Sequence, residues 1–496
     1  MTATLNALWD ETERLHGDRV ALIQGATRWT YRELGERIRG ISASLCREAQ
    51  VAPGDAVALL SPNVPEFVAA YFAILRLAGA VQPVDTRTPP QRWLSELRET
   101  HARALVVHES LAASAATAAA GARFPGHTLA IGPELPAVAG GNARDGHVTA
   151  ESIAELMHTS GTTGIAKAAM RTHANVLAAA RNATRGFGYV ENDVIAVVMP
   201  LSHSSALNSQ LIPFIRFGAA IVLIDRFEPD EVIETLRTHS VTCMRLVPSM
   251  ARLLLGRDHF RGDHLPAIRM LINSSAPVEP ATLASLKARF PRVAVMDSYG
   301  LTEASTCTVL TVDPARPAQG SVGRAIEGVI LEIVDDAGRP AASGMEGEVR
   351  LRGEHVFAGY LGMPDESARA LKDGWLWTGD LGHLDDAGNL YLHGRSSEVI
   401  HCSGYTVHPA TVENCILEMP EVEAVAVTGV AHKLLGQVVK AFVISREPGI
   451  EPRKIVNHCV RSLPSHAVPF HVEFVDTLPR NVTGKLIRRQ LKEMSA

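Results

Sequence analysis

The feature of this sequence that most constrains its fold is the alternation of helix-like and strand-like stretches along most of the chain. "WTYRELGERIRGISASLCREAQ" (29–50) predicts a helix that begins after a threonine cap, and "DAVALLSPN" (55–63) predicts a strand ending in a turn. "VPEFVAAYFAILRLAGA" (64–80) predicts a second helix with glycine near its end. Such alternation favours an α/β protein whose helices cover buried parallel strands.

The size and charge of the chain narrow its class further. With 496 residues it exceeds one ordinary core, so about two or three domains are expected. A hydrophobic content of 46% and a charged content of 20% are typical of a globular protein. The net charge is −5 without a long basic block, so nucleic-acid binding is not expected to be the main task.

The cysteines and the beginning of the sequence indicate a reducing, cytoplasmic location. None of the six cysteines forms a C-x-x-C pair, so neither a zinc site nor a disulfide framework is predicted. "MTATLNALWDETERLHGD" (1–18) lacks a signal-peptide core and predicts an amphipathic helix. The residues expected on its apolar face are Leu5, Leu8, Trp9, Thr12 and Leu15. No apolar run approaches the roughly 20 residues of a membrane span.

Several other segments predict connections or boundaries. "SLAASAATAAAGARF" (110–124) favours a surface helix, and "GPELPAVAGGNARDGH" (132–147) fits either a linker or a loop inside a larger domain. "VDDAGRP" (334–340) and "LDDAGNL" (384–390) each stand between strand-like runs and predict hairpin turns. The pattern changes to shorter βαβ-like pieces after "LYLHGR", so a small C-terminal domain is expected to begin near Ser396.

"HTSGTTGIAK" (158–167) is the strongest local indication of a binding site. "SIAELMHT" before it predicts a strand, and "KAAMRTHANVLAAARNAT" after it predicts a helix. Glycines between a strand and a helix let backbone N–H groups converge on a phosphate, and hydroxyl groups add donors. The spacing of Gly161 and Gly164 differs from the Walker pattern. A loop of serine, threonine and glycine is by itself often only a surface loop, so the interpretation depends on partner motifs.

Such partner motifs follow in a fixed order. They are "SYGLTEA" (298–304), "GEVRLRGEHVFAGYLG" (347–362), "DGWLWTGDLG" (373–382), "GRSSEVIHCSGY" (394–405) and "TGKLIRR" (483–489). Together with "TSGTTGIAK", the set resembles the acyl-adenylate-forming superfamily: acyl- and aryl-CoA ligases, firefly luciferase and peptide-synthetase adenylation domains. The resemblance extends from "TYRELGERI" to "GKLIRRQL".

The resemblance implies a nucleotide site assembled from these motifs. The family converts a carboxylate and MgATP into an acyl-AMP and pyrophosphate, and a thiol then accepts the acyl group. Thr302 is expected to contact the α-phosphate, and Glu303 to hold Mg²⁺ through its hard carboxylate oxygen. The remaining assignments form one set: the phosphate loop Thr159, Ser160, Gly161, Thr162, Thr163, Gly164 and Lys167; Tyr299 and Gly300 at the adenine and acyl sites; Asp380 on the ribose hydroxyls; and Arg395 beside ribose or phosphate.

The resemblance also implies a large N-terminal domain of layered sheets and helices, residues 1–395, and a small mobile α+β C-terminal domain, residues 396–496. Lys485 would reach the acyl carboxylate and α-phosphate, and after rotation about Ser396–Ser397 the turn at Gly404 would face the thiol. His203 would gate the acyl pocket, along which Ser274, Ser275 and Ala276 lie. For His203, an ordinary polar loop histidine remains an alternative.

Four departures from the family pattern bear on the activity. Ala166 and Ala168 stand where proline and glycine usually flank the lysine, which favours weaker adenylation. The pivot carries Ser397 in place of aspartate or lysine. No aspartate follows His203, so an α-amino acid substrate is not expected. The segment 462–474 is poor in the basic residues that bind free CoA, leaving Lys433, Arg453 and Lys454 as candidates.

The leading prediction is a carboxylic acid–CoA ligase that uses ATP, Mg²⁺ and coenzyme A and acts as a monomer or homodimer. Alternatives are a stand-alone adenylating enzyme that loads an acyl carrier protein, and a member that only transfers a preformed acyl-adenylate to a thiol. A non-catalytic acyl- or nucleotide-binding protein represents another class. The small polar segments "SSALNS" and "NSSAPV" suggest a roomy or polar acyl pocket, and the acid itself stays open.

Overall fold

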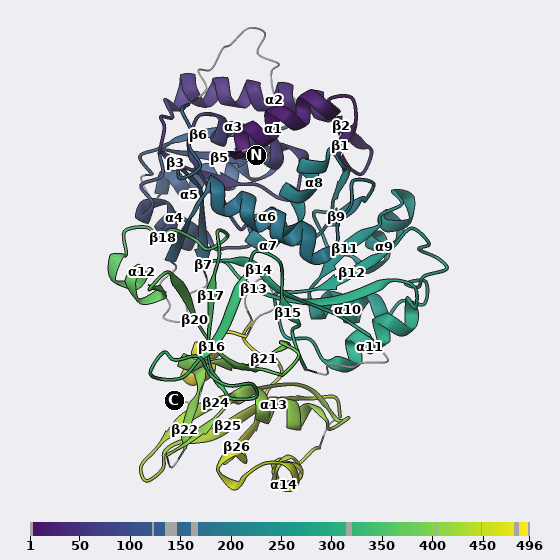
Figure 1. Cartoon of the computed structure of the whole chain (residues 1–496), viewed down its shortest axis with the longest axis vertical. Coiled ribbons are helices and arrows are strands. Elements are labelled where there is room, and N and C mark those ends of the chain that lie inside the picture. Colours follow the sequence, from purple (N-terminus) through teal and green to yellow (C-terminus); the bar gives the residue numbers. More distant parts are fainter. Residues whose placement is uncertain are drawn as a thin grey trace. The chain divides into compact units, whose positions relative to one another are not determined.

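The computed structural model (Figure 1) describes residues 3–121, 124–133, 146–159, 167–313, 320–402, 404–447, 449–480 and 486–494. The chain forms two compact units, Met1–Ile330 with Leu351–Leu376, and Leu331–Arg350 with Trp377–Ala496. The predicted α/β class is confirmed in these units. The predicted domain boundary between residues 395 and 396 lies inside the second unit. That boundary marks where the C-terminal domain is expected to pivot, and it stays a prediction.

The first unit contains two largely parallel sheets. In the described residues, the nine-stranded sheet has the order β15 (Arg324–Ala325), β14 (Ser305–Thr311), β13 (Ala294–Leu301), β12 (Met270–Asn273), β11 (Cys243–Leu246), β9 (Ile195–Val197), β10 (Ile221–Leu223), β1 (Val20–Gln24) and β2 (Thr27–Thr30). The seven-stranded sheet has the order β18 (Gly359–Tyr360), β8 (Lys167–Thr172), β7 (Ile153–Thr159), β4 (Ala80–Val84), β3 (Ala56–Leu60), β5 (Ala104–His108) and β6 (His127–Ile131). Antiparallel partners lie toward the edges of both sheets.

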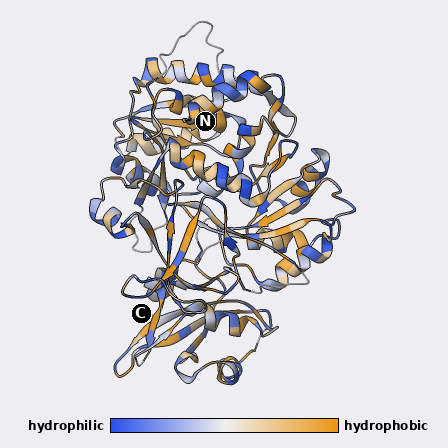
Figure 2. Cartoon of the chain, in the orientation of Figure 1, coloured by the Kyte–Doolittle hydropathy of each residue, from blue (hydrophilic) through white to orange (hydrophobic). Residues whose placement is uncertain are grey.

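Helices cover both sheets of the first unit. They are α1 (Leu5–His16), α2 (Tyr31–Ser44), α3 (Pro65–Arg76), α4 (Pro90–Glu99), α5 (Glu109–Gly121), α6 (His173–Phe187), α7 (Ser204–Ala206), α8 (Ile212–Phe217), α9 (Pro229–Thr238), α10 (Pro248–Leu255), α11 (Pro280–Arg289) and α12 (Pro364–Ala370), with π-helical turns η1 (Leu45–Ala49) and η2 (Leu207–Leu211). The largest hydrophobic cluster contains residues of α1, α2, α3, α6 and α8 and of both sheets. Figure 2 shows strands that are largely hydrophobic, whereas the helices alternate between polar and apolar positions.

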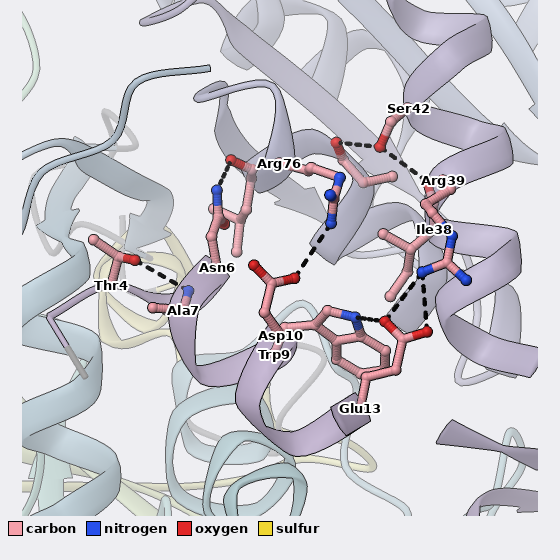
Figure 3. Close-up of polar contacts among 12 residues, drawn as sticks. Thr4, Asn6, Ala7, Trp9, Asp10, Glu13, Ile38, Arg39, Ser42 and Arg76 are labelled. Atoms are coloured by element: carbon pink, nitrogen blue, oxygen red, sulfur yellow. Dashed lines mark hydrogen bonds and ion pairs between the residues drawn. The ribbon is translucent and has the colours of Figure 1, made fainter. Parts of the chain in front are cut away.

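The local signals at the N-terminal helices are confirmed with one exception. Thr30 and Glu33 form a capping box at the start of α2. In α1 (Figure 3), the indole N–H of Trp9 donates to Glu13 over 3.3 Å, and Glu13 also pairs with Arg39 of α2. Leu5, Leu8, Trp9 and Thr12 are buried as expected. Leu15 is the exception, because it lies in the last turn of α1 and is 54% exposed.

The second unit includes most of a third sheet and a C-terminal α+β lobe. The described strands of the third sheet are β16 (Ile330–Val334), β17 (Gly347–Arg352), β20 (Trp375–Leu384), β19 (Leu371–Lys372) and β21 (Leu390–Arg395). The lobe contains β22 (Ile400–Cys402), β23 (Tyr405–Val407), β24 (Val422–His432), β25 (Gly436–Ser445) and β26 (His471–Phe474), with η3 (Ser396–Glu398), α13 (Pro409–Leu417), α14 (Pro452–Ser462), η4 (Ser465–Ala467) and α15 (Arg488–Met494).

Both predicted turns of the third sheet are confirmed. The backbone N–H groups of Asp335 and Asp385 donate to the carbonyls of Arg339 and Asn389, respectively, and the carboxylate of each aspartate accepts backbone N–H groups within its turn. The predicted surface helix is α5, and residues 134–145 of the predicted linker or loop lie outside the described residues. None of the described helices combines the length and hydropathy that a membrane crossing requires.

Candidate functional site

The predicted phosphate segment connects two antiparallel strands. β7 ends at Thr159, β8 begins at Lys167, and these two residues are cross-strand partners. The intervening Ser160, Gly161, Thr162, Thr163 and Gly164 lie outside the described residues. The expected helix directly after the loop is wrong, since Lys167–Thr172 is a strand and α6 begins at His173. Pairing with β7 makes Lys167–Thr172 a strand, and a capping box between Thr172 and Asn175 starts the helix six residues later than predicted.

Lys167 is held by an acidic and an aromatic side chain. Its Nζ forms an ion pair with the carboxylate of Glu366 on α12 and lies 5.2 Å from the ring centre of Tyr360. The hydrogen bond from Lys167 holds the pKa of Glu366 below its ordinary value. The ammonium group of Lys167, which is predicted to bind phosphate, is therefore paired with the carboxylate of Glu366 in this structure.

Glu303, the predicted magnesium ligand, lies in the same neighbourhood. The hydroxyl of Tyr360 donates to Oε1 of Glu303 over 2.7 Å, and the backbone N–H of Phe357 donates to the carbonyl of Glu303 over 2.8 Å. Oε2 of Glu303 accepts no hydrogen bond from the described residues. Tyr360 thus connects the cation of one motif to the carboxylate of another.

Tyr299, Gly300 and Thr302 lie where β13 turns back into β14. A β-bulge interrupts the pairing between Tyr299 and Gly300. A Cβ atom at Gly300 would lie 2.0 Å from the carbonyl oxygen of Ser305, so this position requires glycine. Thr302 and Glu303, the predicted α-phosphate and magnesium residues, both lie in this tight turn.

A buried ion pair supports both the phosphate strand and this turn. Arg171 of β8 and Glu155 of β7 are fully buried, with Nε and Oε2 4.0 Å apart. Arg171 Nη1 donates to the carbonyl of Thr302 over 3.1 Å and to Oγ of Ser305 over 2.5 Å. Arg171 therefore holds the turn at Thr302–Glu303 against β8, the strand that follows the predicted phosphate loop.

Glu155 is held from the other side by neutral donors. Tyr71 of α3 donates to Oε1 over 2.7 Å, and Nδ2 of Asn208 donates to Oε2 over 2.9 Å. Burial raises the pKa of Glu155, while Arg171 and these hydrogen bonds oppose the rise. Because Asn208 belongs to the segment after His203, the network also reaches the predicted acyl region.

His203 does not stand alone in its loop. Its Nε2 lies 3.2 Å from Oδ2 of Asp85, which also forms an ion pair with Arg87. Burial by itself would raise the pKa of Asp85, but hydrogen bonds from His203 and Arg87 outweigh it and hold the pKa below its ordinary value. An ionised Asp85 therefore orients the predicted gate.

The predicted acyl wall begins directly after β12. Ser274 is buried, whereas Ser275 is exposed and has a positive φ of 72°. Ala276 follows at an intermediate exposure. A non-glycine residue in the left-handed region is uncommon and marks a locally constrained backbone.

Asp380 and Arg395 are brought together within the second unit. They are cross-strand partners on β20 and β21, and Nε of Arg395 lies 2.7 Å from Oδ1 of Asp380. Nη1 of Arg395 also donates to the carbonyl of Thr378 over 2.8 Å. Gly379, which precedes Asp380 within β20, has a positive φ of 71°, a conformation that favours glycine.

Lys485 lies outside the described residues, but the chain on both sides of it is anchored. Arg480 pairs with Leu486 across the gap. Arg488, which sequence reasoning missed as a functional residue, donates to Glu413 over 2.6 and 3.0 Å and to Glu398 over 2.8 Å. In the sequence, only its place in the basic run "LIRR" (486–489), next to Lys485, could have drawn attention to Arg488.

Gly404 lies in the turn between β22 and β23 with a positive φ of 83°. The structure thus joins Lys167 to Glu303 through Tyr360, and Asp380 directly to Arg395. Sequence reasoning missed Tyr360, Glu366, Asp85 and the Arg171–Glu155 pair, because no spacing rule links residues that meet only through the fold.

Comparisons with known proteins show the family of this chain. The family model described as AMP-binding enzyme matches residues 9–361, and the model described as AMP-binding enzyme C-terminal domain matches residues 411–485. The chain belongs to this family, the acyl-adenylate-forming superfamily that the ordered motifs indicated.

Three similar proteins illustrate the relationship. Feruloyl-CoA synthase of an Amycolatopsis species is 31% identical over 97% of this chain and 96% of its own length. The 2-succinylbenzoate–CoA ligase of Bacillus velezensis is 31% identical over 97% of this chain and 96% of its own. ATP-bound MatB from Rhodopseudomonas palustris superimposes with a TM-score of 0.90 at 26% identity, covering 100% of this chain and 99% of that one.

Proposed function

We propose that this chain is an AMP-forming carboxylic acid–CoA ligase. The observation that carries the proposal is that Lys167 and Glu303, the proposed phosphate-binding cation and the proposed metal-binding carboxylate, both contact Tyr360. The named activities of the relatives at about 30% identity support the same reaction class.

In the first half-reaction, a substrate carboxylate oxygen attacks the α-phosphorus of ATP, and pyrophosphate leaves. Lys167 and the phosphate loop would hold the β- and γ-phosphates, and Thr302 would contact the α-phosphate. Asp380 would accept the ribose hydroxyls, while Lys485 would bind the reacting oxygens. Mg²⁺ fits the hard carboxylate of Glu303 and would neutralise triphosphate charge when bound.

In the second half-reaction, a thiol attacks the acyl carbonyl and AMP leaves. Rotation about Ser396–Ser397 would exchange Lys485 for the turn at Gly404, whose flexible backbone can approach the thiol closely. Coenzyme A is the proposed thiol. Of the basic candidates for binding it, Lys454 already pairs with Glu421 over 2.6 Å, which leaves Lys433 and Arg453. A carrier-protein thiol therefore remains the alternative acceptor.

The loss of glycine at position 168 does not by itself argue against adenylation. Ala168 is buried in β8 opposite His158, and its carbonyl accepts a hydrogen bond from Leu361. The Cβ of Ala168 therefore lies on a buried strand and not in the predicted phosphate loop.

The direct test measures the two half-reactions separately with a panel of fatty, aryl and polycyclic acids. We expect at least one acid to drive exchange of labelled pyrophosphate into ATP, followed by thioester formation with CoA. Exchange without a CoA thioester, but with acylation of a pantetheinylated carrier, would establish the carrier-loading alternative. Thioester formation from synthetic acyl-AMP without any exchange would establish the transfer-only alternative.

The ion pair between Lys167 and Glu366 predicts competition between a protein carboxylate and ATP. Glu366→Gln removes that negative charge, so we expect the KM for ATP to fall about twofold to fivefold, since a partly exposed ion pair is worth up to about 1 kcal/mol. Arg369→Gln is a matched control, because Arg369 contacts the same carboxylate from a more exposed position. An unchanged or higher KM in Glu366→Gln would mean that the pair orders Lys167 for ATP.

A further inference from the structure

Arg245, on β11, is a buried guanidinium for which the described residues supply no carboxylate partner. The residue is 2% exposed, and its Nε and Nη1 donate to no acceptor among the described residues. Nη2 donates to Oγ of Ser298 over 3.3 Å. A buried charge without a counter-ion is unfavourable, so its presence in the interior requires an explanation.

The side chains around Arg245 are neutral. Its guanidinium carbon lies 4.9 Å from the ring centre of Phe187, and the hydroxyl of Tyr189 is a further neighbour that has no hydrogen-bond partner among the described residues. Arg171 differs in this respect, because it faces the carboxylate of Glu155. Of these two buried arginines, only Arg245 lacks an opposite charge among the described residues.

Arg245 lies close to the predicted acyl region. It pairs in register with Ile272 of β12, one residue before Asn273 and the acyl wall at Ser274–Ala276. Ser298, which accepts its hydrogen bond, immediately precedes Tyr299. These positions lie toward the carboxyl ends of parallel strands, where open α/β sheets bind their ligands.

The segment that contains His203 also has unpartnered polar atoms. The buried atoms without a described hydrogen-bond partner include Oγ of Ser202, Oγ of Ser205, Oδ1 of Asn208 and Oε1 of Gln210. Buried polar groups in native proteins are nearly always hydrogen-bonded, so their concentration in one segment favours a polar ligand. Two of the four are hydroxyl groups, which can donate to an anion.

We propose that Arg245 binds a second carboxylate of the acyl substrate, so that the preferred acids are dicarboxylic acids. One carboxylate is adenylated, and the other lies against Arg245, with the Tyr189 hydroxyl close by. This inference rests on the proposed ligase function and names the substrate class of that site. The second carboxylate supplies the counter-ion that the protein lacks.

The test compares each straight-chain dicarboxylic acid with the monocarboxylic acid of equal length, using pyrophosphate exchange. We expect the wild type to favour the dicarboxylic member, and Arg245→Met to lower kcat/KM for it roughly 30- to 100-fold, as expected for lost hydrogen bonds to a charge. Activity on the monocarboxylic member should stay the same or rise. Arg252→Met, at an exposed arginine of α10 paired with Glu279, is the matched control.

Thermal unfolding without ATP provides a readout independent of catalysis. Arg245→Met should melt at or above the wild-type temperature, because it removes an uncompensated buried charge. The dicarboxylic acid should raise the melting temperature of the wild type and leave that of Arg245→Met unchanged.

A lower melting temperature together with an unchanged acid preference would overturn the proposal and make Arg245 a structural residue. Failure of every acid in the exchange assay would instead contradict the ligase function, while a dicarboxylate-induced stabilisation that depends on Arg245 would still support the anion site.

Discussion

Arg171→Met should lower the free energy of unfolding by about 3–5 kcal/mol, the range observed when one partner of a buried ion pair is removed. Glu155 would remain fully buried at its end of the network, with Tyr71 and Asn208 as its remaining hydrogen-bond donors. The carbonyl of Thr302 would also lose its donor, so the turn at Thr302–Glu303 should become less ordered. Chemical denaturation followed by far-UV circular dichroism measures the effect.

The double variant Arg171→Met with Glu155→Gln is the control for this interpretation. It removes both charges and should recover much of the lost stability, because no unpaired carboxylate remains. If the double variant is less stable than Arg171→Met by the full cost of Glu155→Gln alone, the two charges are not coupled. In that case the contacts of Arg171 with Thr302 and Ser305 would account for its contribution.

Lys485→Ala should lower the rate of acyl-adenylate formation about 10²- to 10³-fold, the usual effect of removing one preorganised donor to a transition state. Thioester formation from synthetic acyl-AMP should change little, because the proposed rotation withdraws Lys485 from that step. Arg488→Met should produce a smaller loss of the same kind, since Arg488 anchors the segment through Glu398 and Glu413. Single-turnover measurements of each half-reaction distinguish these effects.

Arg446→Met, at an exposed arginine of the same lobe, should leave both half-reactions unchanged. Equal losses in the two half-reactions of Lys485→Ala would indicate general disruption of the lobe. Unchanged adenylation would show that Lys485 has been assigned the wrong role, and the ammonium for that step would have to come from another residue.

The local signals of this chain predicted much of its secondary structure. The capping threonine of α2 and the glycine-bearing turns of the third sheet each depend on neighbours within a few residues. Reliance on local signals also explains the wrongly predicted helix directly after the phosphate loop. Periodicity after Lys167 fits a helix, but pairing with β7, which local sequence does not reveal, makes Lys167–Thr172 a strand.

The sequence by itself determined the family, the order of the motifs and the chemical kind of each predicted site residue, because these depend on side-chain identity and spacing. Only the tertiary structure decided that Tyr360 connects Lys167 to Glu303, that Asp85 pairs with His203, and that Glu155 balances Arg171 whereas Arg245 has no described counter-ion. Most members of these groups lie far apart in the chain, and their charges acquire partners only when the fold brings strands and helices together.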